Sequence, residues 1–252
     1  MALESFSAWL ETPQGCYVRA WEQDTLDAMV ADIFGFNALQ IGFPELETLR
    51  ANRMPFRFCC CAQTDAMVRS DPHHLPFATN SLDLVVLPHI LEFDPNPHQI
   101  LREVERVLVP EGSIVVAGFN PFSLWGLRRA LARRGGQPPW QGHYLSVPRL
   151  RDWFALLGFE TRGAEFGCFA PPVTQEKWLA RWAFMEAAGE RWWRPTGAVY
   201  VLQAIKRQHG MRLVTPRWKD RMARAKALAL MPQKPLAQKN MEMREIGDMK
   251  HD

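Results

Sequence analysis

Residues 71–112 constrain the fold of this chain most strongly, because an apolar strand, a polar loop and an amphipathic helix follow one another there. Residues 82–87 read LDLVVL, a nearly continuous apolar run that is typical of a strand covered by helices on both faces of a parallel sheet. Pro88 is expected to end this strand. The segment therefore predicts an α/β domain built around a parallel sheet.

A helix is predicted after Asn96, which can cap it, with Pro97 in the first turn, where a missing N–H costs nothing. Its buried face consists of apolar residues at helical spacing, namely Ile100, Leu101, Val104, Val107 and Leu108. Pro110 and Gly112 are expected to stop the helix before the next buried strand, residues 113–119.

This stretch resembles the class I S-adenosylmethionine-dependent methyltransferases, and among them a type 11 methyltransferase-like domain. In that family an acidic residue, LPF, an Asp-led apolar strand and a helix ending in RVL-x-P-x-G occur in this order, as they do from Asp71 to Gly112. The resemblance covers roughly residues 37–206. It implies a Rossmann-like α/β fold, with a doubly wound, mostly parallel sheet of the seven-stranded type and helices on both faces, and it implies methyl transfer from S-adenosylmethionine.

Strands and helices are expected to alternate along the rest of the chain. Strands are predicted at residues 38–41, 56–61, 159–166 and 197–205, and helices at residues 44–53, 123–134, 148–157 and 176–190. The resemblance makes the last strand antiparallel. Only residues 63–66 separate Ala62 from a candidate strand at 67–70, which is too short for the usual crossover helix, so the fold is expected to lack one helix.

Three parts are predicted along the chain. Residues 1–36 form an N-terminal helical cap, residues 37–207 the methyltransferase-like domain, and residues 208–252 a basic, partly disordered extension. From Lys206 to Lys234 nine basic residues stand against one acid, Asp220. A solvated tail is favoured, and weak contact with a polyanion is the alternative.

Several classes of protein are disfavoured by the sequence. No run of about twenty apolar residues is present, so no membrane span is expected, and the N-terminus does not look like a secretory signal, which favours the cytoplasm. The three consecutive cysteines, residues 59–61, are interpreted as small strand residues rather than metal ligands, because neighbours on a strand point to opposite faces. No metal site is predicted.

A ligand of such a fold binds beyond the carboxyl ends of the strands, where the strand order reverses. The first loop there reads LQIGFPEL, and the resemblance places the methionine part of the cofactor against it. Gly42 matches the family, but Gln40 stands where the family has an acid, and Phe43 is followed by bulky residues that would narrow the site. The acid that ends the family's second strand is missing, with Asp65 as a candidate replacement.

On the resemblance, Asp71 faces the adenine of the cofactor, while a turn-capping role beside Pro72 is the alternative. His89 follows the central strand and could act as a general base, line the site as a donor or be a packed surface histidine. The full set of predicted cofactor-binding residues is Gly42, Phe43, Asp71, His74, Leu75, Leu87 and His89. No catalytic residue is predicted, because methyl transfer can depend mainly on positioning.

The sequence thus indicates an S-adenosylmethionine-dependent methyltransferase of unknown acceptor, and a small-molecule acceptor is favoured over a nucleic acid. A non-catalytic binding or regulatory module with the same fold is the alternative. A third hypothesis, an RNA-associated protein, rests on the basic tail and on the aromatic and basic residues at 191–194. The aromatic region 137–194 is expected to cover the site.

Overall fold

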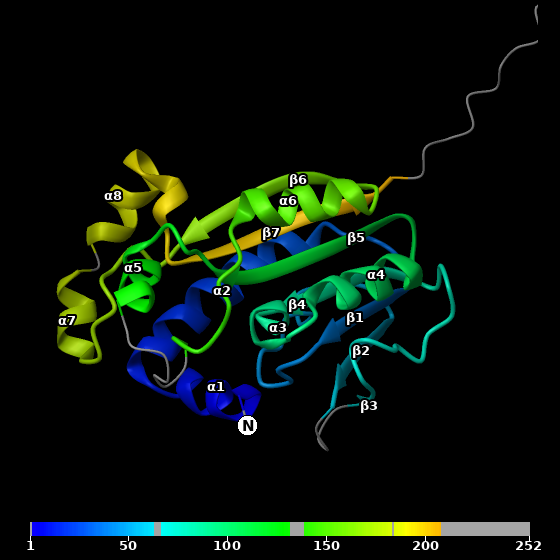
Figure 1. Ribbon diagram of the computed structural model, residues 1–252, viewed down its shortest axis with the longest axis horizontal. Helices are drawn as coiled ribbons and strands as arrows, with labels where there is room; N and C mark the ends of the chain where they lie inside the picture. Colours follow the sequence, from blue (N-terminus) through cyan, green and yellow to red (C-terminus); the bar gives the residue numbers. More distant parts are fainter. Residues whose placement is uncertain (1, 63–66, 132–138, 183, 208–252) are drawn as a thin grey trace, which may run out of the picture. The chain divides into compact units, whose positions relative to one another are not determined.

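A seven-stranded sheet with the order β3-β2-β1-β4-β5-β7-β6 forms the centre of the protein (Figure 1). A computed structural model describes residues 2–62, 67–131, 139–182 and 184–207. The strands are β1 (Asn37–Ile41), β2 (Phe56–Cys61), β3 (Val68–Arg69), β4 (Leu82–Pro88), β5 (Leu108–Phe119), β6 (Phe159–Gly167) and β7 (Val199–Lys206). All pairs are parallel except those of β7, which runs antiparallel to β5 and β6. The predicted fold class and the antiparallel final strand are confirmed.

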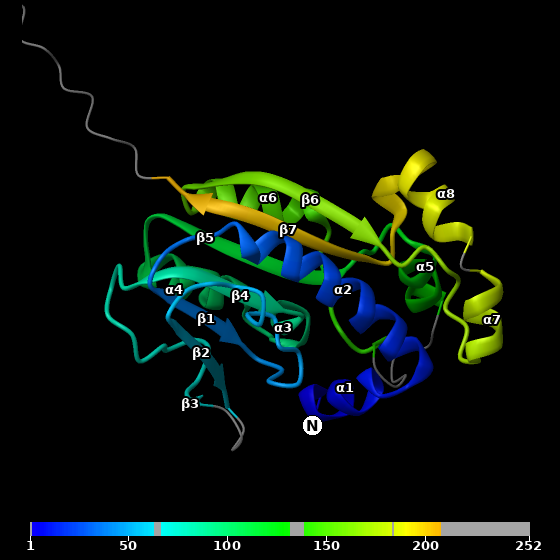
Figure 2. The same ribbon diagram turned by 180° about the vertical axis from the view of Figure 1, so that it is seen from behind.

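Helices cover both faces of this sheet. They are α1 (Ala2–Leu10), α2 (Pro13–Ala31), α3 (Ile90–Phe93), α4 (Pro97–Val107), α5 (Leu124–Leu131), α6 (Val147–Leu156), α7 (Glu176–Arg181) and α8 (Phe184–Trp192), with a short 3₁₀ turn at Arg194–Thr196. Figure 1 shows α4 and α6 on the near face, and Figure 2 shows α2 on the opposite one. None of the helices in the described segments is long and apolar enough to cross a membrane.

The alternation of side chains along β4 divides the core between these two faces. Val85 and Leu87 pack in the cluster that contains the apolar side of α4, whereas Leu84 and Val86 pack with Leu26 of α2. Successive side chains of a strand point to opposite faces of the sheet, so every second residue of β4 lies on the same face. Because both faces are covered, β4 reads as a continuous apolar run, and the prediction from that run is confirmed.

The helix predicted at residues 44–53 is absent, and that prediction is wrong, because these residues form turns. The buried side chain of Gln40 holds them in place. Its carbonyl oxygen accepts from the Oγ1 (2.7 Å) and the backbone N–H (3.1 Å) of Thr48, and its amide donates to the carbonyls of Gly42 and Phe43. Backbone groups of this loop therefore form hydrogen bonds with the Gln40 side chain instead of the hydrogen bonds of a helix.

The predicted end of α4 also needs correction. The helix stops at Val107, and Leu108 already belongs to β5, where it pairs with Leu82. Pro110 and Gly112 lie inside β5, in a segment where the register with β4 shifts. A bulge accommodates a proline that an unbroken ladder would not. Asn96 occupies the position before the helix, but its side chain makes no capping bond.

The helix predicted at 176–190 is two helices, α7 and α8. Glu186 anchors α8 separately, because its carboxylate accepts from the hydroxyl of Tyr17 and from the backbone N–H of Phe169 (2.9 Å). The helix predicted at 123–134 is described as α5, Leu124–Leu131, and its last residues lie outside the described segments. The helix at 148–157 corresponds to α6, and Gly158 ends it with a φ of 79°.

The N-terminal helices α1 and α2 pack in the same compact unit as the sheet. The boundaries predicted for the three parts of the chain remain predictions, and the basic extension lies outside the described residues. Six residues link Cys61 to Val68, and residues 63–66 of this link are likewise not described. Among the described residues, no group of three or more side chains is arranged to hold a metal ion.

Candidate functional site

The strand order reverses between β1 and β4, so the loops after these strands diverge at that point. In open α/β sheets this switch point is where ligands bind. Gly42 follows β1 and His89 follows β4. The structure therefore brings together the two loops that the sequence analysis singled out.

An aromatic ring from α1 lies over this point. The centroid of the Phe6 ring is 4.9 Å from that of Phe43 and 5.0 Å from those of His89 and Phe93. Phe6 is completely buried, and Trp9 and Leu10 of the same helix are buried beside it. The helix α1 thus closes the switch point with apolar side chains.

The backbone of the first loop is tightly held. Gly42 has a φ of 88° and Phe43 a φ of 36°, a left-handed conformation that is costly for a residue with a side chain. A Cβ atom at Gly42 would approach the Cδ1 atom of Ile90 to 3.3 Å. The glycine is therefore needed for close packing against α3, and the Gln40 bonds described above stabilise the strained turn.

The residue after β4, His89, lies between two buried carboxylates. Its Nε2 atom is 2.6 Å from Oε1 of Glu22, and its Nδ1 atom is 2.9 Å from Oε2 of Glu92. Burial alone lowers the pKa of His89, but the two carboxylates outweigh this effect and raise the pKa to about 10. A ring that keeps both protons is a donor on both sides and not a base. His89 is accordingly buried rather than on the surface.

Glu92 extends this network to the end of β5. Its other oxygen, Oε1, accepts from the backbone N–H of Phe119, and burial raises the pKa of its carboxyl. Glu22 contributes one oxygen to His89, while its Oε2 is buried with no partner among the described residues. The three side chains link α2, α3 and the ends of β4 and β5.

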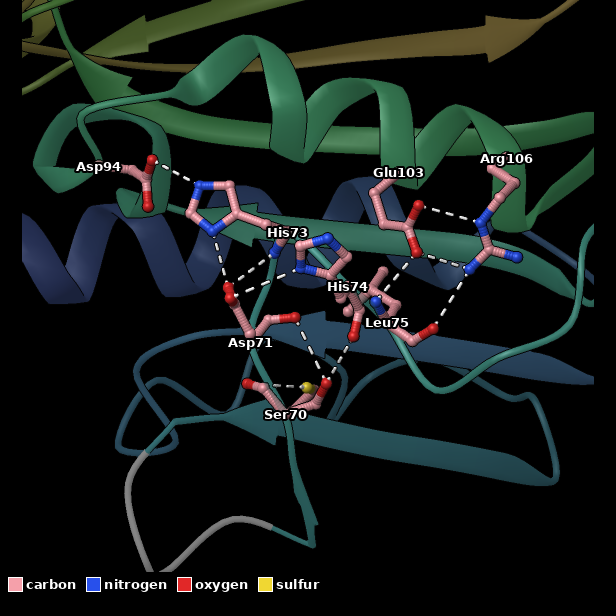
Figure 3. Close-up of polar contacts among 9 residues, drawn as sticks. Ser70, Asp71, His73, His74, Leu75, Asp94, Glu103 and Arg106 are labelled. Carbon is pink, nitrogen blue, oxygen red and sulfur yellow. Dashed lines mark hydrogen bonds and ion pairs between the residues drawn. The ribbon is translucent and has the colours of Figure 1, made fainter.

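The third loop is exposed and forms a polar network of its own (Figure 3). The Asp71 carboxylate accepts from the backbone N–H of His73 (2.9 Å) and contacts its Nδ1 atom at 2.7 Å, while Nε2 of His73 lies 2.9 Å from Asp94. The bond from the His73 N–H holds the pKa of Asp71 below its usual value. An acceptor bond to the N–H two residues on is the turn-capping geometry proposed as the alternative for this residue.

The neighbouring positions His74 and Leu75 differ in burial. His74 is exposed, whereas Leu75 is buried and donates its backbone N–H to Oε1 of Glu103 (3.0 Å), which also pairs with Arg106 (Figure 3). Leu87 is fully buried within β4. Five of the seven predicted cofactor-binding residues are thus buried, namely Gly42, Phe43, Leu75, Leu87 and His89, and two, Asp71 and His74, face solvent.

In this packing the residues present do not accommodate S-adenosylmethionine. The rings of Phe6 and Phe43 fill the switch point, and the Leu75 N–H is already bonded to Glu103. β2 ends at Cys61 without a carboxylate, and Asp65 lies outside the described segments. Four pockets on the described part of the chain are lined by none of the seven residues.

Comparison with known proteins agrees with the fold. The methyltransferase domain family matches residues 48–116. The uncharacterized protein YafS of Escherichia coli (strain K12) is 34% identical over 154 residues, which are 60% of this chain and 64% of that protein. Among solved structures, an S-adenosylmethionine-dependent methyltransferase from Thermotoga maritima superposes with a TM-score of 0.55 at 16% identity, over 72% of this chain and 87% of that one. The chain thus has the fold of solved S-adenosylmethionine-dependent methyltransferases, and residues 48–116 match the methyltransferase domain family.

S-adenosylmethionine is the cofactor of these class I methyltransferases. A chain from the complex between the Haloferax volcanii Trm112 methyltransferase activator and a methyltransferase has the same fold, with a TM-score of 0.58 at 18% identity over 83% of this chain and 99% of that one. The malonyl-[acyl-carrier protein] O-methyltransferase of Halorhodospira halophila is 37% identical over 79 residues, 31% of this chain and 24% of that protein. The matched stretches span 24% to 64% of the lengths of the curated relatives.

Three residues that shape the switch point, Phe6, Glu22 and Glu92, were not predicted. Glu92 stands only three positions after His89, and this closeness in sequence could have been noticed. Phe6 and Glu22 lie far from the site in sequence, and no local pattern marks them. Only the packing of α1 and α2 against the sheet brings them to the site.

Proposed function

We propose that the protein transfers a methyl group from S-adenosylmethionine to a small-molecule acceptor, and that α1 must leave the switch point before the cofactor binds. The position of Phe6 carries this proposal, because its ring packs on Phe43 and His89, two of the predicted cofactor-binding residues. Moving one nine-residue helix would uncover both, whereas moving a strand of the sheet would disrupt the core.

Opening this site has a cost that limits affinity. Phe6, Trp9 and Leu10 are all buried, and fully exposing a large apolar side chain costs about 1.5–3 kcal/mol. When the competent state is rarely populated, the apparent dissociation constant rises by the inverse of its population. The proposal therefore expects weak cofactor binding by the unmodified chain and tighter binding when α1 is loosened.

The test is calorimetric titration with S-adenosylmethionine and S-adenosylhomocysteine. Phe6→Ala removes the ring that lies on Phe43 and is expected to tighten binding about tenfold or more, since tenfold corresponds to about 1.4 kcal/mol. Leu26→Ala is the matched control, because Leu26 is equally buried but packs on the α2 face, away from the switch point. The control should lower stability and leave the affinity unchanged.

The alternative function, a module that has lost cofactor binding, is supported by two observations. Gln40 bonds its own loop where the family has an acid, and β2 ends at Cys61 without a carboxylate. Failure of both the unmodified chain and Phe6→Ala to bind either ligand at millimolar concentration would favour this module and reject the methyltransferase proposal.

The acceptor class is proposed on two grounds. Outside residues 206–234 the chain carries 21 basic and 26 acidic residues, and a net negative body disfavours a nucleic acid. Two of the relatives are named malonyl-[acyl-carrier protein] O-methyltransferases, which makes carboxylates the first acceptors to try. With radiolabelled cofactor, the label should enter base-labile esters of low mass, and label in RNA would contradict the proposal.

A further inference from the structure

Exposed apolar side chains gather at one end of the molecule. Of thirteen large apolar side chains exposed in the described segments, eight come from residues 122–131 and 178–193, and these are Phe122, Leu124, Leu127, Leu131, Trp178, Phe184, Trp192 and Trp193. Figures 1 and 2 show α5, α7 and α8 side by side at that end. Clusters of this kind on a soluble domain mark contact surfaces, whereas scattered single residues do not.

Part of this set forms one hollow. Phe122, Leu124, Met185 and Trp193 line a pocket of about 440 Å³ between the start of α5 and α8. Trp192 and Trp193 contact each other with ring centroids 6.0 Å apart, and Trp192 is 73% exposed. The apolar side chains of the two helices therefore belong to one surface, which we call the aromatic end.

Basic residues accompany these apolar ones. In residues 122–131 and 176–194 the sequence has six basic residues, Arg128, Arg129, Lys177, Arg181, Arg191 and Arg194, and three acids. One of the acids, Glu186, is bonded inward to Tyr17 and Phe169. The guanidinium of Arg181 lies 5.4 Å from the ring centroid of Trp178. The aromatic end thus combines indole rings with excess positive charge.

We propose that the aromatic end binds the surface of an anionic membrane. Tryptophan is favoured at the boundary between headgroups and acyl chains, and arginine can bury its stem there while its charge contacts lipid phosphates. Residues 122–131 supply three leucines, which enter acyl chains but cannot stack on bases, and this disfavours RNA as the partner. In a symmetric contact between two copies the arginines would face one another, which disfavours a dimer.

Cosedimentation of the full chain with vesicles tests this proposal. Binding is expected to phosphatidylcholine vesicles that contain phosphatidylglycerol, to be much weaker without it, and to fall as salt is raised. The double variant Trp192→Ser, Trp193→Ser should reduce partitioning about tenfold or more because apolar area is lost. The double variant Arg181→Gln, Arg191→Gln should reduce it by a similar factor on anionic vesicles only.

The matched control is the double variant Phe34→Ser, Leu156→Ser, because these side chains are also highly exposed but lie elsewhere, in the loop between α2 and β1 and at the end of α6. It should bind vesicles like the unmodified chain. Absence of vesicle binding, or an equal loss in the control, would overturn the proposal.

Three other results would overturn it as well. One is tight binding of RNA that the tryptophan variant abolishes while vesicle binding is absent. A second is a dimer in light scattering that this variant converts to a monomer. A third is vesicle binding that survives the tryptophan variant and is lost when the basic residues beyond Arg207 are neutralised. None of these measurements depends on cofactor binding, so the membrane proposal and the proposed methyltransferase function are tested independently.

Discussion

The Nε2 atom of His89 lies 2.6 Å from Oε1 of Glu22, although the two residues are 67 positions apart in the chain. This bond joins α2 to the end of β4, directly beneath the ring of Phe6. Together with the bond from His89 to Glu92 it places a charged network under an apolar cover. The stability of the switch point therefore depends on a buried charge and its partners.

Glu22→Gln tests that dependence. The substitution removes one partner of a buried ion pair, and such losses typically destabilise a protein by about 3–5 kcal/mol. Asp24→Asn is the control, because it makes the same chemical change at an exposed position of the same helix. Urea unfolding should show a large loss for the first variant and little for the second. Equal losses of stability in the two variants would mean that the Glu22–His89 pair does not stabilise the fold.

The pH dependence of stability should carry the signature of His89. An unfolded histidine titrates near 6.5, whereas the folded pKa is about 10, so the protonated ring stabilises the fold fully below pH 6.5. This stabilisation is lost progressively as the pH rises from 6.5 toward 10. The free energy of unfolding, measured by urea titration across this window, should fall more steeply for the unmodified chain than for His89→Gln. The same pH dependence of the unfolding free energy in both chains would contradict the role assigned to His89.

Gln40→Glu restores the acid that the family has at this position, yet we expect it to destabilise the protein. A carboxylate cannot donate to the carbonyls of Gly42 and Phe43, and leaving buried polar groups unpaired costs about 1–3 kcal/mol. Gln99→Glu, at an exposed position of α4, should change stability by less than about 0.5 kcal/mol. Thermal unfolding of both variants checks this. No difference between them would show that the Gln40 bonds are dispensable.

Asp71→Ala separates the turn-capping role from the proposed cofactor contact. Loss of the bond to His73 should cost only about 0.5–1.5 kcal/mol, because the site is exposed. In the Phe6→Ala background the same change should weaken S-adenosylmethionine binding about tenfold, since a charged hydrogen bond contributes about 1.5–3 kcal/mol. His74→Ala, which alters a neighbouring exposed side chain, is the comparison for stability. Unchanged cofactor affinity would leave Asp71 with the capping role alone.

Lys206 and Arg207 are adjacent, but substitution of Lys206 should lower the stability of the protein much more than substitution of Arg207. The Lys206 Nζ atom donates to the carbonyls of Leu108 (2.9 Å) and Glu105 (2.6 Å) in a buried position. Lys206→Met leaves these carbonyls unpaired and should cost about 2–4 kcal/mol. Arg207→Met breaks ion pairs that are open to solvent and should change little. Chemical denaturation compares the two, and similar losses would contradict this account.

The strands were predictable because their signals are local. The apolar run of residues 82–87 was identified as a buried central strand, and the predicted range 56–61 coincides with β2. Both depend only on neighbours in the chain and on the period of two. The predicted helices were wrong where a bond to a residue farther along the chain outweighs the local preference for a helix. Gln40 binds Thr48, and this bond prevents the helix predicted at residues 44–53. Leu108 pairs with Leu82, and this pairing ends α4 earlier than predicted.

What the sequence by itself determined is the class of fold and the order of its elements, because periodicity, prolines and glycines act over a few residues. It also pointed to the loops of the switch point, since these follow the strands directly. Only the tertiary structure decided what occupies that point. Phe6 and Glu22 reach Phe43 and His89 through the packing of α1 and α2, and side-chain burial by distant segments leaves no trace in the local sequence.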